Sequence, residues 1–401
     1  MTDVYIYDGL RTPFGRHAGA LATVRPDDLL AELIRTVVDR SPFSGHQFED
    51  VIVGCTNQAG EDCRNVARYA GLLAGLPVEV AGLTVNRLCA SGLAAVVDAS
   101  RAVACGQGDL FVAGGVESMS RAPFVMAKSE RAYGRQLTTF DTTLGSRFPN
   151  KKMTELYGDH AMYETAEEVA KDLEITRKAS DCFAAASQER YAKAKADCFF
   201  SGELHSVTIA DRKRGGAMCV VEDEHPRPES DIEKLSALHP LTEGGVVTAG
   251  NASGINDGAV VLLVGSCNVG ERVGAIPMAR IVSAAVAGVE PRLMGLGPVP
   301  AAKKALNRSG LTLADMDVIE INEAFATQVL GCLKLLKISS NDSRVNPNGG
   351  AIAIGHPLGA SGARLVLTAV RQLKRIEGRY ALVALCIGVG QGLAVVVERV
   401  C

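Results

Sequence analysis

Residues 86–92 read NRLCASG, and a near copy of this turn returns late in the chain. LCASG at 88–92 matches LGASG at 358–362, an offset of 270 (358 − 88), with Cys89 opposite Gly359. The surrounding sequence repeats as well, because DVI at 50–52 matches DVI at 317–319 at an offset of 267. A nearly constant offset indicates two copies of one architecture rather than a chance match.

Both copies place the same elements in the same order. Each has a strand, a helix, a DVI strand, the LxASG turn, a long amphipathic helix and an apolar strand that ends in glycine. In the first copy the outer elements are 4–11, 26–40 and 110–118; in the second they are 279–288, 298–310 and 381–392. Alternating strands and helices predict an α/β fold with parallel sheets covered by helices.

The segment between the copies differs from them in composition. Residues from about 121 to 249 are charged and in places helical, and the first copy resumes near residue 250 with GNASGINDGAVVLLVGS. We therefore predict a first core half at 1–120 and 250–275, an inserted loop domain at 121–249, and a second core half at 276–401. Insertions of this kind commonly build the walls of a binding site.

Composition narrows the functional class. The 401 residues carry a net charge of −3, which provides no electrostatic argument for binding nucleic acid or an anionic membrane. No apolar run is long enough to span a bilayer, and the first residues read as a strand rather than a secretory signal. Eleven cysteines without CxxC pairs favour a reducing compartment and argue against structural zinc. We expect a cytoplasmic protein without a metal.

Cys89 is the first candidate for chemistry. It lies directly before a predicted helix, where backbone N–H groups and the helix dipole favour a thiolate. The small residues after it leave room for a substrate to approach. A buried cysteine at a tight turn is the alternative interpretation, and position alone does not decide between them.

Three other polar residues are predicted to lie near Cys89, in one crevice between the two halves. His356 lies in the glycine-rich loop NPNGGAIAIGHPLGASG, and imidazole can take a proton from a thiol near neutral pH. Cys386 and Asn322 follow apolar strands, so they are expected at the carboxyl ends of the strands, where α/β sites lie. A histidine before a proline often has only a structural role. The prediction of a catalytic site therefore rests on Cys89 and these three residues together.

Several longer blocks resemble the signature sequences of the thiolases. These are NRLCASG, TAGNASGINDGA, GLGPVPA, NEAF, NPNGGAIAIGHPLGASGAR and CIGVGQG, in the order of that family and spread over residues 4–400. AGEDCRNVAR at 59–68 and GGVESMSRAPFVM at 114–126 further resemble the 3-oxoadipyl-CoA thiolases of bacterial aromatic catabolism, in the β-ketoadipate pathway. The resemblance implies the thiolase fold: two βαβαβαββ halves in five αβαβα layers, with an inserted loop domain.

The resemblance also implies roles for individual residues. Cys89 is the nucleophile that takes the acyl group as a thioester, and His356 activates it and donates to the thioester oxygen. Cys386 is the second acid/base. Asn322 holds a water that forms one oxyanion hole with His356, and the backbone N–H groups of Cys89 and Gly388 form the other.

Coenzyme A and acyl-CoA are implied as substrates rather than as a permanently bound cofactor. The matching positions are Ala249 and Ser253 for pantetheine, Met162, Met294 and Phe325 for the tunnel wall, and Arg227 near the adenine. The basic turn DRKRGG at 211–216 could attract the 3′-phosphate. For the apolar residues ordinary core packing is the other interpretation, and for the basic turn a solvated loop. Ala161 stands where many biosynthetic relatives have histidine, so the acyl pocket differs there.

The predicted reaction is cleavage of 3-oxoadipyl-CoA with coenzyme A to succinyl-CoA and acetyl-CoA, by a ping-pong thioester mechanism. An acetyl-CoA C-acetyltransferase acting on acetoacetyl-CoA, or a broad 3-ketoacyl-CoA thiolase, is the alternative. A non-catalytic acyl-CoA binder and a cysteine hydrolase are less consistent with the full residue set.

Two further expectations follow from this reading. The resemblance implies a homotetramer, a dimer of dimers joined through residues 124–150. The terminal carboxylate of the predicted substrate needs a cation, and five arginines are candidates unless each pairs with a nearby acid, as Arg64 with Glu61 would: Arg64, Arg87, Arg121, Arg135 and Arg147.

Overall fold

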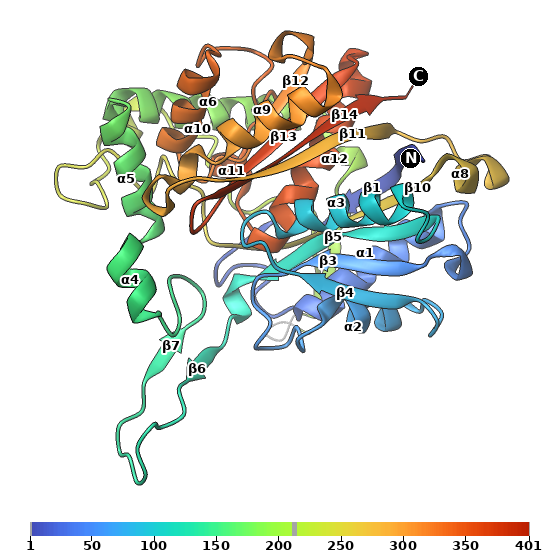
Figure 1. Cartoon of the computed structure of the whole chain (residues 1–401), viewed down its shortest axis with the longest axis horizontal. Helices are drawn as coiled ribbons and strands as arrows, with labels where there is room; N and C mark the ends of the chain where they lie inside the picture. The colour runs from blue at the N-terminus through green and yellow to red at the C-terminus, as the bar shows by residue number, and fades with distance from the viewer. Residues whose placement is uncertain (1, 211–214, 401) are drawn as a thin grey trace.

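A computed structural model describes residues 2–210 and 215–400 (Figure 1). The first half contributes strands in the spatial order β1-β10-β5-β3-β4, and the second half contributes β11-β14-β13-β12. Their bounds are β1 Val4–Arg11, β3 Asp50–Gly54, β4 Ala81–Val85, β5 Leu110–Ser118, β10 Asn256–Ser266, β11 Ala279–Gly288, β12 Val318–Ile321, β13 Tyr380–Ile387 and β14 Gln391–Arg399. β1 and β11 pair over a short antiparallel register, so the two copies meet through equivalent strands.

The sheets are mixed, and the expectation of parallel sheets was wrong for part of each half. β3 runs parallel to β4 and β5, and β12 runs parallel to β13. β10 is antiparallel to β1 and β5, and β14 is antiparallel to β11 and β13. Residues 388–390 are the whole connection between β13 and β14, and so short a turn can join only antiparallel strands. Hydropathy does not reveal this direction, because these strands are apolar on both faces.

Helices cover both sheets and fill the space between them, which confirms the five-layer arrangement. α1 (Pro26–Arg40) and α2 (Val66–Ala74) cover the first half, and α9 (Pro298–Ser309) and α10 (Ala326–Leu336) cover the second. α3 (Ser91–Ala104) and α12 (Leu358–Ile376) lie side by side between the sheets, in the middle of Figure 1. α1 buries one face, whereas α12 is buried on nearly all sides because it contacts strands of both halves.

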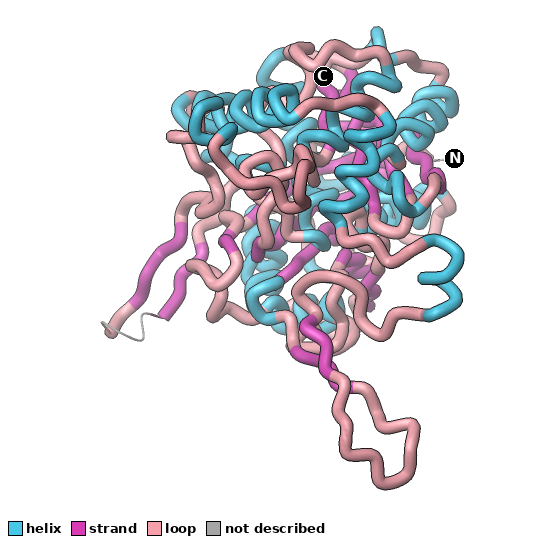
Figure 2. Tube along the Cα trace, turned by 90° about the vertical axis from the view of Figure 1, so that its left-hand side faces the viewer, coloured by secondary structure: helices cyan, strands magenta, loops and turns pink. Residues whose placement is uncertain are grey.

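The segment between β5 and β10 extends around and beyond this core. Its elements are η2 Met119–Arg121, β6 Phe124–Met126, β7 Thr139–Asp141, α4 Lys151–Tyr157, α5 Met162–Asp172, α6 Arg177–Ala196, η3 Phe199–Gly202, β8 Val207–Ala210, β9 Ala217–Val220 and α7 Ile232–Ser236. The remaining elements are β2 Gly15–Arg16, η1 Gly45–Gln47, α8 Cys267–Val273, η4 Pro291–Leu296, η5 Leu313–Asp315 and α11 Ala351–Ile354. The β6–β7 hairpin projects from the body as a long arm (Figures 1 and 2). None of the helices in the described part of the chain is long and apolar enough to cross a membrane.

Candidate active site

The duplicated turn has two different surroundings, and these explain why only one copy carries a thiol. A Cβ atom on Gly359 would lie 2.3 Å from the carbonyl oxygen of Val116 and 2.6 Å from that of Gly54. Real Cβ atoms do not approach backbone oxygens this closely, so α12 can pack against the strands of the first half only with glycine here. The second copy therefore has no room for a side chain at the position equivalent to Cys89.

The turn that carries Cys89 is held by hydrogen bonds between the Ser91 hydroxyl and the backbone. The Ser91 hydroxyl donates to the Leu88 carbonyl at 2.6 Å and accepts the Arg87 N–H at 2.9 Å. Leu88 has a φ of 46°, a strained value for a non-glycine residue, and Val389 on the opposite loop has a φ of 64°. Strained residues thus lie on both sides of the point where the two halves present Cys89 and Gly388 to each other.

The thiol of Cys89 is protonated in the resting protein. Burial raises its pKa to about 11, although the backbone N–H groups of Gly388 and of Cys89 itself act in the opposite direction. The expectation that the helix start lowers this pKa was wrong, because burial outweighs the backbone donors. A nucleophilic role for Cys89 therefore requires a base that takes its proton during attack.

His356 has the properties of such a base. Its backbone N–H donates to Asn256 Oδ1 at 2.8 Å, and its Nδ1 lies 2.6 Å from Ser361 Oγ. Since the Ser361 hydroxyl donates to the Pro357 carbonyl at 2.9 Å, the network assigns the ring proton to Nδ1 and leaves Nε2 unprotonated. Burial first, and then the charge of Arg364, lowers the pKa of His356 to about 3, so the imidazole is neutral.

Asn322 and Cys386 lie beside these two residues. Asn322 follows β12 and its Nδ2 lies 3.3 Å from His356 Nε2, while its Oδ1 has no partner among the described residues. Such a buried, unpaired amide oxygen suits a group that binds a water or a substrate atom. Burial and then the neighbouring Cys89 raise the pKa of the Cys386 thiol well above its usual value. No hydrogen bond within the described part of the chain joins Cys89 directly to His356.

The candidate coenzyme A residues are brought together only in part. The Ser253 N–H donates to the Ala324 carbonyl at 2.9 Å, which ties the GNASG loop to the NEAF loop. Phe325 packs on Met294, Ala324 and Cys386, and a Cβ on Gly388 would lie 3.7 Å from Met162 Sδ.

The outer candidates lie apart from that cluster. Ala249 is exposed. Arg227 is also exposed, and its guanidinium donates to carbonyls of its own loop, those of Glu224, His225 and Pro226. Residues 211–214 of the basic turn lie outside the described residues.

Glu117 is a residue of the site that the sequence analysis did not find. Its buried carboxylate accepts the N–H groups of Thr56 at 3.0 Å, Asn57 at 3.2 Å and Gly359 at 2.9 Å. It therefore joins β5 of the first half to the LGASG turn of the second. The sequence could have identified Glu117, because it is a carboxylate inside the apolar strand LFVAGGVES and a buried acid needs hydrogen-bond partners.

The described residues contain no group of three or more histidine, cysteine, aspartate or glutamate side chains that could hold a metal ion. The centre thus consists of two thiols, one neutral imidazole, an amide and backbone N–H groups. Donors and proton carriers of this kind support acyl transfer through a thioester.

A duplicated five-layer α/β fold with this centre at the seam of its halves defines a thiol-dependent acyltransferase. The model of the thiolase N-terminal domain matches residues 4–267 and that of the C-terminal domain matches residues 275–399, so the chain belongs to the thiolase family. A 3-oxoadipyl-CoA/3-oxo-5,6-dehydrosuberyl-CoA thiolase from Escherichia coli (strain K12) is 54% identical over 402 residues, covering 100% of both chains.

Two solved structures match over nearly their full length. The acetyl-CoA acetyltransferase of Bacillus anthracis has a TM-score of 0.92 at 37% identity, covering 100% of this chain and 99% of the other. The human mitochondrial 3-ketoacyl-CoA thiolase in complex with CoA has a TM-score of 0.91 at 35% identity, covering 100% and 98%.

Proposed function

We propose that this enzyme cleaves 3-oxoadipyl-CoA with coenzyme A to give succinyl-CoA and acetyl-CoA. The observation that carries the proposal is the 54% identity, over the whole of both chains, to a thiolase named for 3-oxoadipyl-CoA. The thiolase centre itself is compatible with other 3-oxoacyl chains, and the match to an acetyl-CoA acetyltransferase favours acetoacetyl-CoA thiolysis as the second candidate.

In the first half-reaction Cys89 attacks the 3-oxo carbon while His356 takes the thiol proton. The N–H of Gly388, which reaches the Cys89 sulfur, would stabilise the tetrahedral oxyanion together with the Cys89 N–H. The bond between C2 and C3 then breaks, and its electron pair leaves as the enolate of acetyl-CoA. Cys386 gives its proton to C2, and a succinyl group remains on Cys89.

In the second half-reaction the thiol of coenzyme A attacks the succinyl thioester. Cys386, now a thiolate, takes the thiol proton, and succinyl-CoA leaves from Cys89. The imidazolium of His356 returns its proton to the Cys89 thiolate, so both cysteines end in the thiol form. In the first half-reaction, the imidazolium of His356, which then carries the Cys89 proton on Nε2, and the amide of Asn322, 3.3 Å from that nitrogen, would stabilise the enolate oxygen. Coenzyme A would approach between the GNASG and NEAF loops and the inserted segment 121–249, which we propose as its binding wall.

Arg147 is the arginine we propose for the terminal carboxylate. Of the five candidates, Arg121 pairs with Glu61, whereas the other four form no ion pair among the described residues, so the expected pairing of Arg64 with Glu61 was wrong. Arg147 donates to the Thr56 carbonyl and to Asn57 Oδ1 at 3.4 Å, and forms no ion pair among the described residues.

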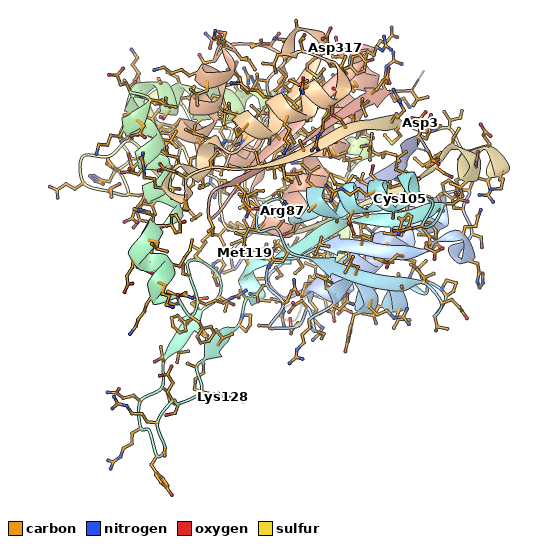
Figure 3. All side chains as sticks on the ribbon, in the orientation of Figure 1. Asp3, Arg87, Cys105, Met119, Lys128 and Asp317 are labelled. Atoms are coloured by element: carbon orange, nitrogen blue, oxygen red, sulfur yellow. The ribbon has the colours of Figure 1, made fainter. Side chains whose placement is uncertain are left out.

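The Thr56 carbonyl connects this arginine to the nucleophile. It also accepts Asn86 Nδ2 at 3.1 Å, and Asn86 lies in the turn that carries Cys89. Arg87 is in the same turn, and Figure 3 shows it where the two halves face each other. Arg147, through the Thr56 carbonyl, and Arg87, by its place in the chain, are therefore the two candidates linked to the turn that carries Cys89.

The variant Arg147→Ala is expected to lower kcat/KM for 3-oxoadipyl-CoA by roughly 10²-fold, because a charge-assisted contact contributes about 3 kcal/mol. Acetoacetyl-CoA lacks the terminal carboxylate, so its kcat/KM should change little. Steady-state assays with both substrates measure this, with Arg87→Ala alongside and Arg135→Ala on the exposed arm as the control. A wild type that prefers acetoacetyl-CoA, or variants that never separate the substrates, would support the general thiolase instead.

We also propose that the protein is a homotetramer joined through its arm. The β6–β7 arm exposes large apolar side chains, with Tyr133 100% and Phe124 74% accessible, and Figure 3 places Lys128 on it away from the body. Exposed apolar groups of this size mark interaction surfaces. Sedimentation velocity at micromolar concentration should show a tetramer, and deletion of 127–138 should reduce it to a dimer. A monomeric wild type would contradict the proposal.

A further inference from the structure

Among the described residues, two arginines are fully buried, and their hydrogen bonding differs sharply. The guanidinium of Arg11 donates to Glu203 at 2.6 Å and to both carboxylate oxygens of Asp223 at 2.6 and 2.9 Å. Arg364 is equally buried, yet none of its three nitrogens has a hydrogen-bond partner among the described residues. Its ion-pair partner is Glu320 at 3.7 Å, whose two oxygens also lack hydrogen-bond partners there. A pair left in this state costs stability, so packing alone does not explain it.

The pair lies directly behind the candidate base. Arg364 is three residues after Ser361 on α12, and Ser361 holds His356 Nδ1. Glu320 is two residues before Asn322, which contacts His356 Nε2. Residues three apart on a helix and two apart on an extended strand share a face, so the Arg364–Glu320 pair extends the His356–Asn322 contact into the interior.

We propose that Arg364 and Glu320 are positioning residues that control the protonation of His356. The fixed charge of Arg364 adds to the burial of the ring in keeping the imidazole neutral, and Glu320 sets how much of that charge His356 experiences. The inference rests on the proposed function, because it gives His356 the role of the base for Cys89.

The other ionisable groups around the imidazole are committed to other partners. They are Glu117 on β5, Glu323 after β12, and the thiols Cys89 and Cys386. Glu117 accepts three backbone N–H groups, and Glu323 accepts hydrogen bonds from Ser187, Asn346 and the Ile352 N–H. Both thiols are protonated at neutral pH. Glu320 is thus the one of these three carboxylates whose oxygens have no hydrogen-bond partner among the described residues.

The pH dependence follows from the two buried groups. Burial, only partly offset by Arg364, raises the pKa of Glu320 to about 8. Below that pH Glu320 is neutral and the charge of Arg364 acts on His356 without compensation. Above it, the ionised Glu320 balances Arg364, so the pKa of His356 rises. The ring is still neutral at this pH, but it becomes a stronger base for Cys89, and exchange should increase through an inflection near pH 8.

The pH profile of label exchange between coenzyme A and acetyl-CoA tests this, because exchange reports acyl transfer to Cys89 alone. The wild type should keep its activity down to about pH 5. In Arg364→Met the pKa of His356 should rise, although burial still holds it below its ordinary value near 6.5, so exchange at pH 5.5 relative to pH 8 falls by at most about tenfold. Arg364→Lys keeps the charge and should restore the wild-type profile. Glu320→Gln should not change how exchange depends on pH below neutrality. It should remove the inflection of the exchange rate near pH 8.

Each outcome separates this inference from its alternatives. A uniform loss of exchange in Arg364→Met at every pH, with unchanged circular dichroism, would mean that Arg364 is structural and would overturn the proposal. If that variant does not fold, Glu320→Gln decides, because an unaltered inflection near pH 8 contradicts the role of the pair. Retained exchange in His356→Ala would instead refute the proposed function on which the inference rests.

Discussion

Replacing Cys89 with alanine is expected to lower kcat/KM for thiolysis by at least about 10⁴-fold and to abolish covalent acylation. The structure places this thiol at the start of α3, within reach of the Gly388 N–H and next to Cys386. The wild type is incubated with acetyl-CoA and quenched in acid, and its peptides are analysed by mass spectrometry. The peptide that contains Cys89 should carry one acetyl group. The alanine variant should gain none.

Cys105 provides a matched control for this experiment. It ends the same helix, α3, but is exposed and lies outside the candidate site. Cys105→Ala should acylate and turn over like the wild type. A stable acyl group on Cys386 together with an unmodified Cys89 would contradict the assignment of the nucleophile.

The element order of this fold could be predicted from sequence because the two copies check each other. The strand at 279–288 and the helix at 26–40 have the predicted bounds. Strand direction could not be predicted in the same way. β10 and β14 are buried along almost their whole length, and a strand buried on both faces has the same apolar pattern whether its neighbours are parallel or antiparallel.

The chemical types of the site residues could also be predicted, but their electrostatics could not. The helix start at Cys89 is visible in the sequence, whereas the burial that raises its pKa depends on how the two halves close over it. The same holds for Arg121, whose partner Glu61 is sixty residues away. Arg364 looks like an ordinary charged residue on a helix until packing places it behind His356. Burial and ion pairing depend on residues that are distant in the chain, so the sequence around a single residue does not predict them.

Cys386→Ser is expected to separate the two half-reactions. Exchange of label between coenzyme A and acetyl-CoA should fall far less than thiolysis, because Cys89 and His356 are intact and the thiol of coenzyme A, unlike the α-carbon, is acidic enough to lose its proton without Cys386. Thiolysis of acetoacetyl-CoA should fall by about 10²- to 10⁴-fold, the contribution typical of a general acid or base. Acetoacetyl-CoA is the better substrate here, since it removes the terminal carboxylate from the comparison.

The physical reason lies in the proton that Cys386 must deliver to carbon. Its thiol is fully buried against Met294 and Ala324, so no solvent donor replaces it, and a serine hydroxyl is far less acidic than a thiol. Cys332 offers a matched control, because it is an equally buried thiol that donates to the Gly295 carbonyl at 3.2 Å and has no proposed role in the reaction. Cys332→Ser should change exchange and thiolysis by the same small factor. If Cys386→Ser also lowered both activities equally, Cys386 would not be the second acid/base, and the carbon–carbon step would need another proton donor.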